Sequence, residues 1–156
     1  MAKKTYKLFD LASNQLQTAI VLFCSGSDRF SVITLAGAAD VIFSQLVTRA
    51  GKDNFTNYML KKENDSCSIK EAGKQINDTF FINAMKHLDP GEDEYVSLDP
   101  DECALGAILK ALANYNMLDG KNEKLIIGFR AWIQINLDLK KYNIPSLDHA
   151  AENQLS

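Results

Sequence analysis

Apolar residues recur at helical spacing along most of the chain. Positions three and four apart share one face of a helix, and no segment alternates with the period of two that a strand would show. The pattern predicts an all-α fold, a single-domain up-and-down bundle of five principal helices. These cover residues 8–23, 30–46, 68–88, 99–120 and 123–142, and a short helical turn fits residues 54–61.

Start and stop signals support several of these boundaries. Ser68 and Glu71 have the spacing of a capping box, and Asp99 followed by Pro100 is typical of a helix start. Glycines are expected just past helix ends, as at Gly26 and Gly120.

The segment 30–46 is apolar around nearly its whole circumference, which predicts a helix at the centre of the bundle. Its small residues 35–39 favour close approach of a neighbouring backbone, which would offset the roughly 1 kcal/mol that Gly37 costs in helix propensity. Polar residues within it argue against a membrane span.

Length and composition fit one globular domain over residues 1–156, with a core at 5–144 and a tail at 145–156. The first residues do not have the pattern of a secretion signal, so we expect a cytoplasmic protein. Cys24, Cys67 and Cys103 form no Cys-x-x-Cys pair. We therefore expect neither a metal site nor a cofactor.

Charge is unevenly distributed along the chain. The formal net charge is −3, and seven acids with no base fall between Asp89 and Glu102. A protein that binds double-stranded DNA would be more basic, so we regard that function as disfavoured.

Two polar residues interrupt the apolar stripe of the predicted helix 68–88. Asn83 and His87 follow Ile76 and Phe80 at helical spacing, which would aim both toward a core or an interface. Asp40, the only acid of the second predicted helix, is a candidate partner, and its carboxylate would favour the imidazolium form of His87. Such residues form either a structural hydrogen-bond network or an acid–base site, and both interpretations stay open.

The segments Phe30–Asp40 and Asn83–Pro90 resemble an uncharacterised branch of small bacterial proteins related to the HEPN superfamily. HEPN domains are helical bundles that commonly dimerise, and many are metal-independent ribonucleases. Their signature is an Arg, often followed by Asn, with a His a few residues later. The resemblance assigns the Asn to Asn83, the His to His87 and the acid of the second helix to Asp40, whereas the Arg position holds Ile82.

Isoleucine cannot bind the scissile phosphate, and Lys86 supplies only an offset point charge instead of a guanidinium fork. We therefore expect a homodimeric, non-catalytic or regulatory protein that binds RNA, a nucleotide or another protein. One alternative is a ribonuclease in which His87 transfers protons and Lys86 or Arg130 contacts phosphate. Another is a helical scaffold in which Asn83 and His87 only stabilise packing.

Overall fold

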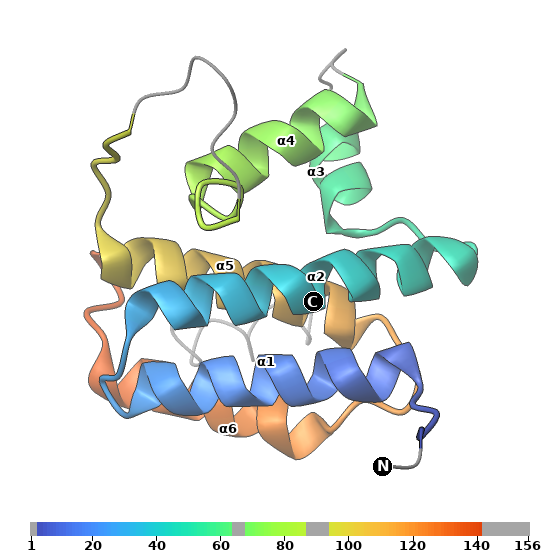
Figure 1. Cartoon of the computed structure of the whole chain (residues 1–156), viewed down its shortest axis with the longest axis horizontal. Coiled ribbons are helices and arrows are strands. Elements are labelled where there is room, and N and C mark those ends of the chain that lie inside the picture. The colour runs from blue at the N-terminus through green and yellow to red at the C-terminus, as the bar shows by residue number, and fades with distance from the viewer. Residues whose placement is uncertain (1–2, 64–67, 87–93, 142–156) are drawn as a thin grey trace, which may run out of the picture. The chain divides into compact units, whose positions relative to one another are not determined.

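The computed structural model describes residues 3–63, 68–86 and 94–141, and these residues form six α-helices and no strand (Figure 1). The all-α prediction is confirmed. The helices are α1 (Leu8–Cys24), α2 (Arg29–Arg49), α3 (Phe55–Glu63), α4 (Ile69–Thr79), α5 (Pro100–Asn116) and α6 (Glu123–Asn136).

The predicted helix starts are confirmed by their capping hydrogen bonds. Ser68 and Glu71 form both bonds of the capping box at α4. The Asp99 carboxylate accepts from the backbone N–H groups of Asp101 and Glu102, and Pro100 is the first residue of α5. These bonds satisfy donors that have no partner within the first turn of a helix.

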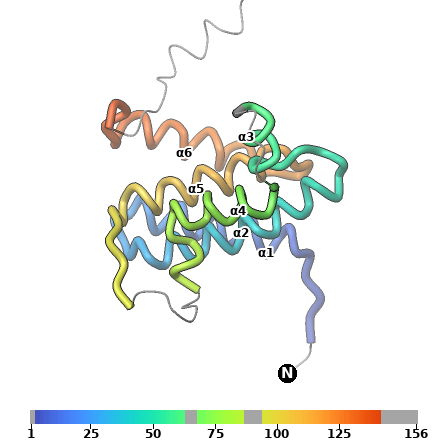
Figure 2. The backbone as a smooth tube through the Cα atoms, turned by 90° about the horizontal axis from the view of Figure 1, so that it is seen from above, coloured from blue at the N-terminus to red at the C-terminus, as the bar shows by residue number. Residues whose placement is uncertain are grey.

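Residues 1–121 form one compact unit in which α2 packs against both α1 and α5. Figures 1 and 2 show these three helices running alongside one another. The central position predicted for this apolar helix is confirmed. Near the start of α1 and the end of α5, the rings of Phe9, Phe43 and Tyr115 meet with centroids 4.9 to 6.0 Å apart.

α1 and α2 are antiparallel, whereas α2 and α5 run parallel. Arg29 and Asp101, at the starts of α2 and α5, form an ion pair, and Asp40 lies opposite Lys110 farther along both helices. In the sequence, α3 and α4 come between α2 and α5, and they lie above these two helices in Figure 1.

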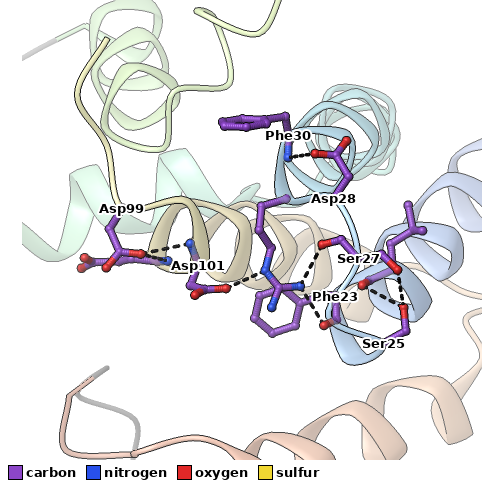
Figure 3. Close-up of polar contacts among 10 residues, drawn as sticks. Phe23, Ser25, Ser27, Asp28, Phe30, Asp99 and Asp101 are labelled. Carbon is purple, nitrogen blue, oxygen red and sulfur yellow. Dashed lines mark hydrogen bonds and ion pairs between the residues drawn. The ribbon is translucent and has the colours of Figure 1, made fainter.

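The starts of α2 and α5 are joined at one corner of the bundle. Arg29 donates through Nη1 to the Phe23 carbonyl at 2.8 Å, and its guanidinium carbon lies 4.4 Å from the centroid of the Phe23 ring. Figure 3 shows Phe23, Ser27 and Asp101 converging on this guanidinium, with Asp28 capping α2 beside it. The cation thus links the end of α1 to both helix starts.

The short helix predicted near residues 54–61 is confirmed as α3. Asn54 donates to Ser44 Oγ at 3.0 Å and to Thr48 Oγ1 at 3.2 Å, which attaches the start of α3 to α2. The Phe55 N–H donates to Asn114 Oδ1 at 2.8 Å, which attaches it to α5. α4 then packs on α3.

Residues 122–156 form a second unit, whose described part is α6 and the residues that follow it to 141. Ile126, Phe129 and Ile133 are buried on one face of α6. The helix ends at Asn136, where Leu137 is extended, so its predicted extent to 142 is wrong. That the whole chain is a single domain stays a prediction.

α2 is also the described helix with the length and apolar composition that crossing a membrane requires. It nevertheless buries Asp40 in an ion pair and packs against α1 and α5. Packing against helices on two sides is typical of the central helix of a bundle.

Candidate functional site

The segment that was predicted as one helix over residues 68–88 is interrupted. α4 ends at Thr79, and the next turn is closed by two backbone bonds, from Phe81 N–H to the Asp78 carbonyl at 3.0 Å and from Ile82 N–H to the Asn77 carbonyl at 2.8 Å. Phe81 adopts a left-handed φ of 55°. This pattern is a Schellman motif, in which a left-handed residue ends the helix.

The interruption overturns the predicted stripe. Asn83 lies in a turn beyond the end of α4, so it does not share a helical face with Ile76 and Phe80. His87 lies outside the described residues. Its predicted contact with Asp40 therefore stays a prediction.

Glycines on two neighbouring helices make room for this turn. A Cβ added at Gly37 of α2 would come within 2.5 Å of Ile82 Cγ2, and one added at Gly106 of α5 would overlap the Phe80 ring. The small residues of α2 therefore permit the close approach that was predicted. The group that approaches Gly37 is a side chain, that of Ile82. The prediction that a neighbouring backbone approaches here is therefore wrong in this detail.

Beside this turn lies a buried network of charged and amide groups. The Asp40 carboxylate, 3% exposed, accepts from Lys110 Nζ and from Asn114 Nδ2, the latter at 2.7 Å. Lys110, 5% exposed, also donates to Asn77 Oδ1 at 2.8 Å. Because Asn114 accepts from the Phe55 N–H, this network joins α2, α3, α4 and α5.

Each member of this network has a partner. A buried charge is tolerated when it is paired and its remaining hydrogen-bonding capacity is satisfied. Asp40 has a cation and an amide donor, and Lys110 has an anion and an amide acceptor. The geometry is that of a hydrogen-bond network that fixes how four helices meet.

Sequence reasoning missed Lys110 and Asn114. A signal was present, because Lys110 is the one cation in the apolar stretch 103–115, as Asp40 is the one acid in the apolar stretch of α2. Lys110 and Asn114 are also four residues apart, so both lie on one face of α5. Opposite lone charges in two apolar helices favour a buried pair.

Asn83 and Lys86 lie in the turn that follows α4. Asn83 Nδ2 donates to Asp78 Oδ1 at 2.6 Å, so its described partner is not Asp40. Lys86 is exposed as a residue, but partial burial around its amine lowers its pKa. The Asp40 carboxylate opposes this lowering of the pKa of Lys86, and the Lys110 ammonium adds to it.

Ile82, at the position of the family's arginine, is 1% exposed and contacts Gly37. Arg130, the other candidate phosphate contact, belongs to the second unit. Within the described residues, no group of three or more His, Cys, Asp or Glu side chains is arranged to hold a metal ion.

Comparisons with protein-family models, with curated proteins and with solved structures returned no match for this chain. The resemblance to HEPN proteins therefore stays a prediction.

Proposed function

We propose that this chain is a HEPN-like protein of the cytoplasm that acts by binding and does not cleave RNA. The observation that carries the proposal is the burial of Ile82 against Gly37. An enzyme of this family would need a cation at that position, directed at a phosphate. Here the position holds an apolar side chain that forms part of the packing between α2 and the turn after α4.

The surroundings of Asp40 support the same proposal. Its carboxylate is occupied by Lys110 and Asn114, so it is committed to packing between helices. Each of its two oxygens accepts from a side chain of α5, and these bonds join α5 to α2. Asp40 therefore fits a structural role better than a catalytic one.

The surface proposed for binding is the turn that carries Asn83 and Lys86. Lys86 is exposed, and it adds a positive charge beside a pair whose own charges cancel. Asn83 is partly exposed, and its amide, which donates one hydrogen to Asp78, has a second hydrogen to donate. A cation beside an amide suits an RNA phosphate, a nucleotide or an acidic protein segment.

Binding and cleavage are separated by one experiment on RNA. The protein is incubated with total cellular RNA, and both retained and shortened RNA are measured for the wild type, Lys86→Ala and His87→Ala. Lys124→Ala, a change at an exposed lysine of α6, is the control. We expect retention without shortening, weakened by Lys86→Ala and unchanged by Lys124→Ala.

Other results would contradict the proposal. Shortening of RNA that disappears in His87→Ala would identify the chain as a ribonuclease. If the protein captures no RNA, nucleotide or protein from lysate, and His87→Ala only lowers the free energy of unfolding, the chain is a scaffold.

We also propose that the protein is a homodimer, as the resemblance implies. Exposed apolar side chains such as Phe30 and Val41, each 50% exposed on α2, are consistent with an interface. Light scattering is expected to give twice the chain mass of 17.4 kDa. A mass of one chain at micromolar concentration would contradict the dimer.

A further inference from the structure

The turn after α4 packs against α2 and α5 at one glycine of each helix. Ile82 occupies the space at Gly37, and the Phe80 ring occupies the space at Gly106. Neither space would exist if an alanine stood at the glycine. The position of this turn is therefore fixed by packing of two large side chains against two glycines.

The same segment covers the polar network. Asn77, in the last turn of α4, accepts a hydrogen bond from Lys110 Nζ at 2.8 Å. Lys110 is only 5% exposed with the segment in place. α4 itself packs on α3, and Asn77, Phe80 and Ile82 connect this segment to α2 and α5.

Backbone strain lies at the centre of this connection. Phe81, between the two inserted side chains, has a φ of 55°, a region that bulky L-residues rarely adopt. Such a conformation persists only where the surrounding contacts hold it. Release of Phe80 and Ile82 would leave Phe81 held only by the backbone bonds to Asp78 and Asn77.

We propose that residues 69–86 form a lid that opens as a unit and thereby controls access to Lys110. Opening withdraws Phe80 and Ile82 from the glycines, breaks the bond between Asn77 and Lys110, and leaves Asp40 and Asn114 in place on α2 and α5. The lysine donor released from Asn77 then becomes available to an oxygen atom of a ligand. This inference does not rest on the binding function proposed above.

The proposal is tested by the reactivity of Lys110 toward an amine-acylating reagent, followed by peptide mass spectrometry. Gly37→Ala and Gly106→Ala place a methyl group where the lid inserts, so both should favour the open state. Labelling of a protected group follows the population of the open state when opening is fast. We expect the labelling rate of Lys110, relative to exposed Lys124, to rise about tenfold or more.

Gly128→Ala is the matched control, because nothing lies within 4 Å of a Cβ at that glycine of α6. It should leave Lys110 labelling unchanged. Combining Gly37→Ala with Ile82→Ala should restore protection, since the smaller side chain leaves room for the added methyl group. If Gly37→Ala does not fold, Ile82→Ala alone opens the lid by removing one of its contacts.

Three results would overturn the proposal. In the first, Lys110 of the wild type reacts as fast as Lys124. In the second, neither Gly37→Ala, Gly106→Ala nor Ile82→Ala changes its reactivity. In the third, its labelling rises only in step with amide exchange at buried positions of α1 such as Leu16, which would report general unfolding.

Discussion

Asp40 and Lys110 are one acid and one base, each placed on the buried side of an apolar helix. Removing either charge from water is costly, and the pair is tolerated because each offsets the other. The amides of Asn77 and Asn114 take up hydrogen-bonding capacity that the ion pair leaves open. The whole arrangement therefore depends on both charges being present.

Removing one charge should be far more harmful than removing both. Lys110→Met leaves Asp40 buried without a cation, and we expect the free energy of unfolding to fall by about 3 to 5 kcal/mol. The double variant Asp40→Leu/Lys110→Met should recover most of this loss. Urea unfolding followed by circular dichroism measures both values.

A surface pair provides the control for this prediction. Lys61 and Asp53 also form an ion pair, with their side chains 69% and 47% exposed. Lys61→Met should therefore cost less than about 1 kcal/mol. If Lys61→Met and Lys110→Met lowered the free energy of unfolding equally, burial of the Asp40–Lys110 pair would not increase the cost of losing its cation.

Lys86 makes stability depend on pH in the alkaline range. Burial lowers its folded-state pKa below the ordinary lysine value of 10.5, so the unfolded chain binds the proton more tightly. The charged amine therefore opposes folding at neutral pH, and stability is regained as the pH rises from the folded pKa toward 10.5.

Two substitutions separate this effect from other alkaline changes. Lys86→Gln should be more stable than the wild type at pH 7, with a difference that shrinks as the pH rises. Lys86→Arg keeps its charge throughout, so the wild type should gain stability relative to it over the same range. Chemical unfolding at several pH values checks both trends, and parallel curves for all three proteins would count against this role of Lys86.

At the scale of elements, the end of α4 differs most from its sequence pattern. The turn requires residue 81 to adopt the left-handed backbone conformation, whereas an uninterrupted helix would require the right-handed α conformation. Glycine and alanine respond to these two conformations in opposite ways. Both substitutions remove the ring, so their difference isolates the backbone.

We expect Phe81→Gly to be more stable than Phe81→Ala by about 1 kcal/mol, because glycine adopts positive φ without a steric penalty. Inside a continuous helix, Phe81→Ala would instead be the more stable by a similar amount. Thermal unfolding of the two variants measures the sign of this difference. The reverse order would restore the uninterrupted helix that the apolar pattern predicted.

Helix starts were predicted better than helix ends, for a physical reason. The starts at Ser68 and Asp99 depend on side chains that bond to nearby backbone groups, so the signal is local in sequence. The end at Thr79 depends on Phe80 and Ile82 fitting against Gly106 and Gly37, which are distant in sequence. A local pattern cannot contain that information.

The candidate site, like the helix boundaries, was predicted only in part. Asp40 stood out as a lone acid in an apolar helix, but its described partners, Lys110 and Asn114, were not predicted, and its contact with His87 stays a prediction. The family resemblance concerns residues 83–87 and contains no residue of α5. Charge complementarity between two apolar helices would have been the better guide.

At the scale of the whole molecule, two kinds of contact hold residues 1–121 together. α1, α2 and α5 meet through apolar side chains, including the rings of Phe9, Phe43 and Tyr115. α3 and α4 are attached to α2 and α5 through the polar network and the inserted side chains of the lid. Loss of the first kind of contact should unfold the bundle, whereas loss of the second should release only α3 and the lid.

The single-domain prediction can be tested through Trp132, because it is the one tryptophan of the chain and lies in α6 of the second unit. Its fluorescence reports on α6, whereas far-ultraviolet circular dichroism reports mostly on the helices of residues 1–121. An isolated helix as short as α6, with 14 residues, is marginal in water. We therefore expect both signals to change at the same urea concentration.

Phe43→Ala sharpens this test, since Phe43 is fully buried between α1 and α5 and its loss should cost about 3 to 5 kcal/mol. If the chain unfolds as one domain, this substitution in α2 lowers the midpoint of the Trp132 signal as much as that of circular dichroism. If the midpoint of the Trp132 signal stays fixed while the other falls, α6 unfolds independently. The two compact units would then be separate domains.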